Sequence, residues 1–428
     1  MTTIEQIHKA FLGSSGACTD TRDIAEGVLF FALKGQRFDA NAFAAEALGK
    51  GARQVVVDDP QVVRDERYLL VPNVLVALQE LGRHHRRTFN IPVIGITGSN
   101  GKTTTKELLH AVLAVDRPTL ATTGNLNNHI GVPLTLLGLT GEHRIAIIEM
   151  GANKPGDIAE LAAIAEPTHA LITNIGRAHL EGFGGLEGVV RTKTELYAHI
   201  KAHGGQLFVN ADDGLLMEKS AGLRRATYGT TPKADTSGAL VGEGPFMELV
   251  FAGRDGRAYH VATRLIGDYN LPNALAAVAI GQYFGVADDR IAEALAAYVP
   301  GNNRSEFRDT GRNQLVMDAY NANPTSMAAA LRNLAAMRSD RPKLAILGDM
   351  LELGADSARE HEAIVALVKD LGLAARFVGP EFQLRTKELS YPDAASLLGS
   401  LNKEPLTGHL VLVKGSRGIR LEAVVEAL

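Results

Sequence analysis

The stretch Val93–Thr105 constrains the fold more than any other part of this sequence. An apolar run of strand length, Val93–Thr97, leads into a glycine-rich turn, and a helix is expected to begin at about Lys102. Gly98 and Gly101 allow the backbone to curl around an anion, while free N–H groups and the helix N-terminus supply partial positive charge. The stretch therefore predicts an α/β fold with a phosphate-binding loop.

The side chains of this loop indicate a nucleotide as its ligand. Lys102 can reach β- and γ-phosphates, and the Thr103 hydroxyl suits Mg²⁺. Ile96 stands where the common G-x-x-x-x-G-K-[ST] pattern has its first glycine, so the loop is the shorter G-x-x-G-K-T. A tight strand-to-helix turn with a chance lysine is the alternative interpretation. The residues expected to contact phosphate are Gly98, Ser99, Asn100, Gly101, Lys102, Thr103 and Thr104.

Apolar runs alternate with helical stretches along most of the chain, which predicts mostly parallel sheets with helices on both faces. Residues 220–268 are richer in Gly and Thr, and we expect them to form an inserted set of β-hairpins. A long Ala-rich helix is expected from about Pro272 to Phe284. The predicted strands after residue 92 are 93–97, 145–149, 170–174, 206–210, 315–318, 343–347, 376–378 and 409–413.

The chain has 428 residues, enough for two to four domains at about 100–200 residues each. A small α/β unit is expected at the start, with helical stripes near residues 4–11 and 74–81. The basic patch 83–87 that follows is interpreted as a solvated helix end and an interdomain linker. The segment 300–303 is the expected hinge to the last α/β unit. We expect three domains, 1–84, 85–299 and 300–428.

The charge balance and the cysteine content exclude several classes of protein. The formal net charge is −4, without the basic excess of nucleic-acid binders. Cys18 is the only cysteine, which excludes an intrachain disulfide framework and fits a reducing compartment. The N-terminus lacks the pattern of a signal peptide. The uncharged stretch 269–287 contains Pro272, so we interpret it as a buried helix. We expect a soluble, cytoplasmic protein that binds neither nucleic acid nor membranes.

Three further residues are candidates for the chemistry. Glu149 ends an apolar run, and ligands of such sheets bind at the carboxyl ends of the strands, so it could hold Mg²⁺ opposite Thr103. A strand-capping surface acid is the alternative. His179 lies in a loop after the run 170–174, and by chemistry alone it is a surface residue, because Mg²⁺ prefers oxygen ligands. Lys193 is by default a solvated helix lysine.

Together these motifs resemble the Mur ligases, the ATP-dependent amino-acid ligases of peptidoglycan synthesis, over essentially the whole chain. The matching segments are a shortened phosphate loop (97–104), a His and carbamylated-Lys motif (174–179 and 193–195), a nucleotide-base motif (267–270 and 273–277) and two C-terminal points of contact with ATP (Arg304 and 318–320). The resemblance implies a small UDP-binding α/β domain, a central P-loop ATPase domain and a C-terminal Rossmann-like ligase domain.

Five more motifs are similar to one branch of the family, the MurF type, which joins D-alanyl-D-alanine to UDP-N-acetylmuramoyl-tripeptide. They are 124–133, 149–153, 320–323, 348–354 and 414–417. The segments 20–22 and 31–35 resemble the family's UDP-sugar-binding domain. Asp39-Ala40-Asn41 replaces the Asp-Gly-His common there, which affects the contacts expected near the uridine.

The resemblance implies a role for each matched residue. Lys102, Glu149, His179 and Lys193 would be catalytic, with Thr103 and Glu149 on one Mg²⁺ and with His179 and a carbamylated Lys193 on a second. The expected ATP contacts outside the loop are Asn270, Asn273, Arg304, Asp318 and Tyr320, and the expected substrate contacts are Thr21, Arg22, Asn125, Asn127, Asn128, Asn323 and Arg417.

For several of these residues a purely structural role stays open as an alternative. Asn270 and Asn273 could cap the following helix, and Arg304 could be a surface hinge charge. Asp318 could be a strand-end acid. Asn125, Asn127 and Asn128 could build turns, and Arg22 could be an exposed charge.

The implied reaction passes through an acyl phosphate and yields UDP-N-acetylmuramoyl-pentapeptide, ADP and phosphate. The partners would be small-molecule substrates, and we expect a monomer. A folylpolyglutamate synthetase-like ligase, a non-catalytic nucleotide sensor or scaffold, and a kinase are the rivals. Segments 320–323 and 348–354 argue against the first, and the full set of phosphate and metal contacts argues against the second. A kinase would need no amine to complete turnover.

Overall fold

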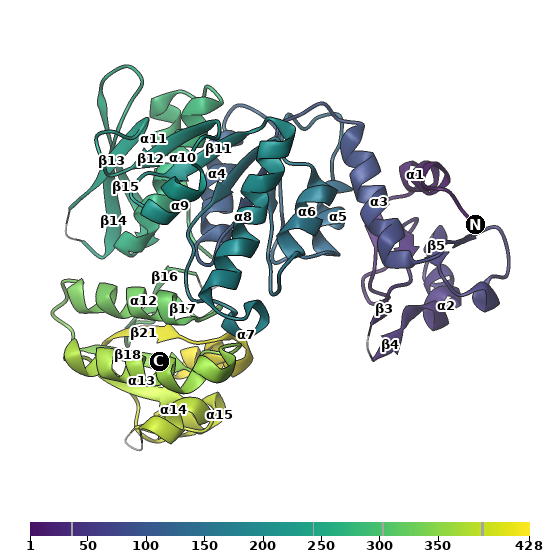
Figure 1. Ribbon diagram of the computed structural model, residues 1–428. Coiled ribbons are helices and arrows are strands. Elements are labelled where there is room, and N and C mark those ends of the chain that lie inside the picture. Colours follow the sequence, from purple (N-terminus) through teal and green to yellow (C-terminus); the bar gives the residue numbers. More distant parts are fainter. Residues whose placement is uncertain (36, 243, 302–303, 387–388) are drawn as a thin grey trace.

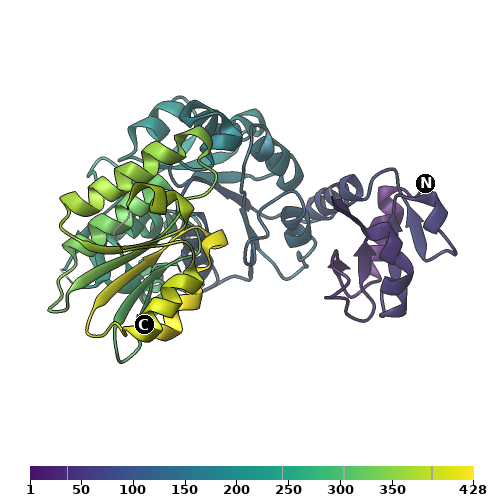
Figure 2. The ribbon, with the colours of Figure 1, turned by 90° about the horizontal axis from the view of Figure 1, so that it is seen from below.

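The computed structural model describes the chain except residues 36, 243, 302–303 and 387–388, so the second half of the expected hinge lies outside the described residues. Three helix-covered sheets follow one another along the chain (Figure 1). The N-terminal unit extends to one side, whereas the central and C-terminal units lie against each other (Figures 1 and 2). No described helix has the length and apolarity to cross a membrane.

The N-terminal unit is built on a parallel sheet in the order β1-β2-β5-β6. Its helix α1 begins with a capping box at Thr3, and the Asn73 side chain caps α3 by accepting from the Val76 N–H group. Its elements are α1 (Ile4–Leu12), β1 (Ala17–Cys18), β2 (Leu29–Phe31), β3 (Lys34–Gly35), β4 (Phe38–Asp39), α2 (Ala44–Gly49), β5 (Gln54–Val57), β6 (Tyr68–Leu70) and α3 (Val74–Arg87).

The basic end of α3 packs against the central unit, so the predicted solvated helix end is wrong. His85 and Arg86 are buried, and the Arg86 Nε donates to a backbone carbonyl of the central unit at 3.2 Å. Arg83 and Arg87 both pair with the Glu166 carboxylate. The arginine side chains bind to a carboxylate and to carbonyl groups that are distant in sequence. A local sequence pattern cannot reveal such partners.

The central unit has a nine-stranded sheet among the described residues, in the order β15-β14-β13-β12-β11-β10-β7-β9-β8. The strands from β8 to β13 are parallel, and β13, β14 and β15 are antiparallel. The strands are β7 (Val93–Thr97), β8 (Thr119–Ala121), β9 (Ile145–Glu149), β10 (His169–Ile172), β11 (Gln206–Asn210), β12 (Arg225–Gly229), β13 (Thr236–Val241), β14 (Phe246–Ala252) and β15 (Ala258–Ile266).

Residues 220–268 form antiparallel hairpins from β13 to β15 as expected, but they are not an insertion. β12 pairs in parallel with β11, and β13 pairs in parallel with β12, before the antiparallel strands follow. The segment therefore extends the main sheet, because backbone hydrogen bonds join it to β11 without interruption.

Helices of the central unit cover both faces of this sheet (Figure 1). The Ala-rich helix α10 is buried as predicted, and it lies so near α4 that a Cβ at Gly281 would be 2.6 Å from Val112 Cγ1. Gly281 thus lets α10 pack closely against α4, and at the other end of the two helices a Cβ at Gly101 would be 2.6 Å from Asn273 Oδ1. The helices are α4 (Lys102–Leu113), α5 (Gly131–Leu136), α6 (Asp157–Ala165), α7 (Leu180–Phe183), α8 (Leu186–His203), α9 (Gly214–Lys219), α10 (Leu271–Tyr283) and α11 (Asp288–Ala297).

The C-terminal unit is a Rossmann-like sheet in the order β16-β17-β21-β18-β19-β20, parallel except for β16. Its predicted strands are present, and Arg417 begins a short 3₁₀ turn, Arg417–Ile419. Its elements are β16 (Glu306–Asp309), β17 (Gln314–Asp318), α12 (Pro324–Ala336), β18 (Lys343–Gly348), α13 (Ser357–Asp370), β19 (Ala374–Val378), α14 (Pro380–Arg385), β20 (Ser390–Tyr391), α15 (Ala394–Lys403) and β21 (Leu410–Lys414).

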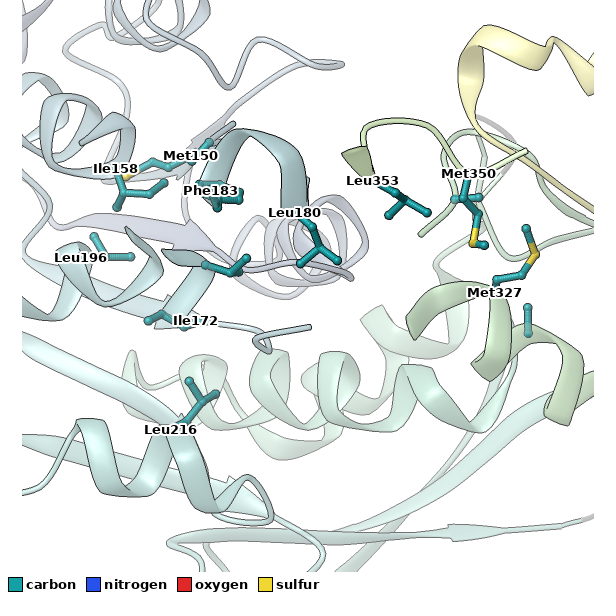
Figure 3. Close-up of a cluster of buried hydrophobic side chains, with 14 of the residues drawn as sticks. Met150, Ile158, Ile172, Leu180, Phe183, Leu196, Leu216, Met327, Met350 and Leu353 are labelled. Atoms are coloured by element: carbon teal, nitrogen blue, oxygen red, sulfur yellow. The ribbon is translucent and has the colours of Figure 1, made fainter. Parts of the chain in front are cut away.

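One apolar cluster joins the central and C-terminal units. Leu180 and Phe183 of α7 belong to the same buried cluster as Met350 and Leu353, which follow β18 (Figure 3). All four side chains are at most 5% exposed. This contact turns the carboxyl ends of the C-terminal strands toward the phosphate loop.

Candidate active site

The two glycines of the phosphate loop lie where no other residue fits. Gly98 and Gly101 have φ values of 145° and 79°. A Cβ at Gly98 would lie 1.9 Å from Thr173 Oγ1, and one at Gly101 would lie 2.6 Å from Asn273 Oδ1. The loop therefore needs glycine for its conformation and for its close contact with neighbouring strands and helices.

Lys102 begins α4 and lies over the loop. Its Nζ donates to the Gly98 carbonyl at 2.7 Å. Burial lowers its pKa, the nearby Glu149 carboxylate opposes this shift, and the positive charge of Arg304 adds to it. The site therefore gathers positive charge that a bound polyphosphate would compensate.

Glu149 provides a carboxylate suited to a cation. It ends β9, is 1% exposed, and its Oε1 accepts from Asn127 Nδ2 at 2.7 Å. Its Oε2 is buried without a hydrogen-bond partner among the described residues. An unpaired buried carboxylate oxygen is costly unless a cation or donor is bound to it. With the Thr103 hydroxyl in the same cavity, this donor set fits Mg²⁺.

The protein supplies few metal ligands by itself. In the part of the chain that the structure describes, no three His, Cys, Asp or Glu side chains form a metal-binding group. Mg²⁺ usually takes one or two carboxylates together with substrate phosphates.

Lys193 on α8 is 2% exposed, so its default interpretation as a solvated lysine is wrong. Its Nζ lies 5.6 Å from the centroid of the Phe183 ring. Burial holds its pKa well below the ordinary value, and the charge of Lys102 adds to the shift, although Asp157 and Glu195 oppose it. The amine is therefore far more readily neutral than that of a surface lysine.

His179 follows β10 in a loop that reaches the C-terminal unit. Its backbone has a left-handed φ of 52°, and its Nδ1 contacts the Glu352 carboxylate. The same loop contributes Arg177, whose Nη1 donates to Glu360 Oε1 at 2.9 Å. Two carboxylates of the C-terminal unit thus contact one loop of the central unit.

Asn270 and Asn273 do not cap α10, so the capping alternative is wrong. Asn273 Oδ1 accepts from Thr105 Oγ1 at 3.0 Å, and its Nδ2 donates to Asn270 Oδ1 at 2.9 Å. Asn270 Nδ2 donates to the Ile266 carbonyl at 2.8 Å. These amides instead connect α10 to α4 beside the phosphate loop.

The C-terminal unit presents an aromatic ring and an ion pair to the cavity. The Arg304 guanidinium lies 3.6 Å from the centroid of the Tyr320 ring, and Arg417 Nη1 lies 3.3 Å from the Tyr320 hydroxyl. Asp318 Oδ2 accepts from the buried Lys414 Nζ at 2.6 Å. Cation–π contact and ion pairing fix this edge of the sheet.

Asn323 links the units at the phosphate loop itself. Its side chain caps α12 by accepting from the Ser326 N–H group, and its Nδ2 donates to Asn100 Oδ1 at 2.7 Å. A cavity of about 900 Å³ lies between the two units. The predicted residues that line it are Ser99, Asn100, Gly101, Lys102, Thr103, Thr104, Asn125, Asn127, Asn128, Glu149, His179, Asn270, Asn273, Arg304, Asp318, Tyr320 and Asn323.

Comparison with known proteins identifies the family. The Mur ligase middle domain matches residues 96–281, and the glutamate ligase domain of Mur ligases matches residues 303–417. A UDP-N-acetylmuramoyl-tripeptide–D-alanyl-D-alanine ligase of Bacillus subtilis (strain 168) is 34% identical over 96% of this chain and 93% of its own length. The chain belongs to the Mur ligase family.

Solved structures of the MurF type resemble this Mur ligase over almost its whole length. MurF from Acinetobacter baumannii has 32% identity and a TM-score of 0.88, with 99% of this chain and 98% of that chain covered. MurF ligase from Thermotoga maritima, solved in complex with ADP, has 30% identity and a TM-score of 0.86, with 97% of both chains covered. The expected three-part Mur ligase architecture is therefore confirmed.

Some predicted residues of this Mur ligase lie outside the cavity lining. Gly98 lies within the loop and Lys193 behind the site, while Thr21 and Arg22 belong to the N-terminal unit. Arg22 Nε donates to Asp20 Oδ1 at 2.9 Å, and its side chain is exposed. Arg417 approaches the cavity through Tyr320.

Sequence reasoning assigned no role to several lining residues, among them Asn174 and Lys414, although both begin a matched motif. Asn174 Oδ1 accepts from the Asn100 N–H group at 3.0 Å and so tethers the phosphate loop. Its position just after β10, at the same sheet edge as Glu149, is a signal that could have found it. Glu352 offered no such local signal, because its partner His179 is distant in sequence.

Proposed function

We propose that this Mur ligase joins D-alanyl-D-alanine to UDP-N-acetylmuramoyl-tripeptide with ATP, which gives the pentapeptide, ADP and phosphate. It is an ATP-dependent amide-bond-forming ligase of peptidoglycan precursor synthesis, as its relatives are named. The observation that carries the proposal is the cavity between a phosphate loop and the strand ends of a second sheet. Such a cavity accommodates a nucleotide and an acceptor on opposite sides.

The reaction couples two displacements. A carboxylate oxygen of the tripeptide attacks the γ-phosphorus of ATP, and ADP leaves, which gives an acyl phosphate. The D-alanyl-D-alanine nitrogen then attacks the acyl carbon, phosphate leaves, and the amine loses a proton. Lys102 and Arg304 would neutralise charge as the phosphoryl group moves. The apolar contact of Leu180 with Leu353 would hold the units together and exclude water from the acyl phosphate.

We further propose two Mg²⁺ sites. Thr103 and Glu149 would hold the first ion, and His179 with a carbamylated Lys193 would hold the second. Bound Mg²⁺ supplies positive charge that lowers the repulsion between the tripeptide carboxylate and the triphosphate. The unpaired Glu149 Oε2 supports the first site.

A carbamate at Lys193 follows from the state of its amine. A neutral amine attacks CO₂, a nitrogen–carbon bond forms, and the amine releases a proton. The product carries a negative charge and two oxygens, which suit Mg²⁺ better than an ammonium group does. The buried position of Lys193 and the lowered pKa of its amine support this modification.

The other predicted contacts complete the proposal. Asn270 and Asn273 would bind the adenine, and Asp318 and Tyr320 would bind the nucleotide from the C-terminal side. The substrate contacts are proposed as Thr21 and Arg22 for the UDP-sugar, and Asn125, Asn127, Asn128, Asn323 and Arg417 for the peptides. We propose domains 1–84, 85–299 and 300–428, and a cytoplasmic monomer that acts on small molecules without nucleic acid.

Substrate omission tests the function. Phosphate release is measured with ATP, Mg²⁺, UDP-N-acetylmuramoyl-tripeptide and D-alanyl-D-alanine, and each substrate is left out in turn. We expect release only with both acceptors present, together with a product of pentapeptide mass. Release with neither acceptor, or none under any combination, would contradict the ligase reaction and favour an ATPase or a scaffold.

A further inference from the structure

His179 has one ring nitrogen engaged by the other unit of the protein. Its Nδ1 pairs with a carboxylate oxygen of Glu352, which follows β18 in the C-terminal sheet. When a carboxylate binds one imidazole nitrogen, it fixes the tautomer and the ring orientation, and the other nitrogen is left to bind a metal.

The backbone at both residues of this contact has an uncommon conformation. His179 and Glu352 both have left-handed φ values, 52° and 64°. Such values are unfavourable for residues other than glycine, and they persist where the surrounding structure holds them. Here Leu180 and Leu353, each next to one partner, belong to one apolar cluster, and the Glu181 N–H group donates to the Glu352 carbonyl at 3.4 Å.

Two hydrogen bonds anchor the segment just before Glu352. The Met350 N–H group donates to the buried His361 Nε2 at 3.0 Å, and the Leu351 N–H group donates to Ser416 Oγ at 2.9 Å. His361, to which the reaction assigns no role, thus fixes the segment just before Glu352. A carboxylate on an anchored segment can hold a partner ring in one orientation.

We propose that Glu352 is a positioning residue that holds the His179 ring with Nε2 free for the second Mg²⁺. Because Glu352 belongs to the C-terminal unit and His179 to the central unit, the second site is complete only when the two units are docked. The inference rests on the proposed function, since that function supplies the second Mg²⁺.

Manganese binding tests this proposal without turnover. Mn²⁺ replaces Mg²⁺, a non-hydrolysable ATP analogue fills the nucleotide site, and bound Mn²⁺ is counted by electron paramagnetic resonance. We expect two Mn²⁺ per wild-type chain. In Glu352→Ala the second Mn²⁺ should bind about 10–100-fold more weakly, the loss typical of a removed carboxylate partner, while the first is unchanged.

Two control variants separate positioning from docking. Glu360→Gln removes the Arg177 ion pair across the same interface without touching His179. Glu362→Ala changes an exposed acid of α13. We expect both to retain the second Mn²⁺ within about threefold of wild type, well inside the 10–100-fold effect expected for Glu352→Ala.

Three results would overturn the inference. Unchanged Mn²⁺ binding in Glu352→Ala would exclude the positioning role. Equal weakening in Glu352→Ala and Glu360→Gln would show that docking alone matters. One Mn²⁺ in the wild-type chain would refute the second metal site itself, and the substrate-omission assay then tells whether the ligase reaction also fails.

Discussion

Gly101→Ala should damage the phosphate loop in a way that the structure quantifies. Gly101 has φ 79°, and an added Cβ would lie 2.6 Å from Asn273 Oδ1. The left-handed conformation costs alanine about 1–2 kcal/mol. Asn273 would also have to move away from Thr105, which loses a buried hydrogen bond worth about 0.5–1.5 kcal/mol. Together these lower the unfolding free energy by about 1.5–3.5 kcal/mol.

Gly204→Ala is the matched control. Gly204 ends α8 with φ 68°, and a Cβ there would meet no atom within 4 Å. This variant carries the same backbone penalty without the steric clash. The loss of unfolding free energy should therefore be about 1 kcal/mol larger for Gly101→Ala than for Gly204→Ala. For a unit of this size the difference lowers the Tm by a further 2–4 °C or so.

Differential scanning fluorimetry with and without ADP measures both effects. At about 100 times Kd, ADP should add about 2.7 kcal/mol to wild type and to Gly204→Ala. Gly101→Ala should gain much less, because the loop N–H groups that bind phosphate are displaced. Equal Tm values for the two variants, with full ADP stabilisation of both, would refute the reasoning.

Three further perturbations address other parts of the site. Lys102→Ala should lower kcat by about 10²–10³-fold or more in the phosphate-release assay, and wild-type ligation would refute the phosphate-loop assignment. Lys193→Met should abolish ligation yet raise the Tm near neutral pH, because the buried amine disfavours its own charge. That gain should shrink as the pH rises toward the ordinary lysine pKa of 10.5, and a Tm gain independent of pH would contradict it. Asn323→Ala should lower the unfolding free energy measured with urea by about 1 kcal/mol. Asn323→Asp should lower it less, because it keeps the cap of α12 and loses only the donor to Asn100. Equal losses in both would contradict the capping role.

Local patterns predicted the central strands of the two larger sheets and the helices α4 and α10. The strand 93–97 and the helix start at Lys102 follow from an apolar run and two glycines, and both are as expected. The Glu149 position also followed locally, because a residue at the carboxyl end of a parallel strand lies at the ligand-binding edge of the sheet. The family was recognisable for the same reason, since its motifs are short and continuous in sequence.

The sequence-based predictions were wrong where contacts with residues distant in sequence determine the burial of a side chain or the pairing of a strand. The basic end of α3 is buried because Glu166 and carbonyls of another unit receive its cations. Asn273 bonds to Thr105 and not to its own helix, because α10 packs beside α4. Residues 220–268 extend the main sheet because β11 offers a free edge, which no periodicity in the segment reveals.

The sequence by itself determined the strands next to the phosphate loop, the loop itself and the identity of the residues that carry charge at the site, because these depend on side chains near one another along the chain. Tertiary structure alone decided that Lys193 is buried and that Glu352 meets His179. Burial and ion pairing depend on which surfaces pack together, and that is set by the whole chain and not by any one segment.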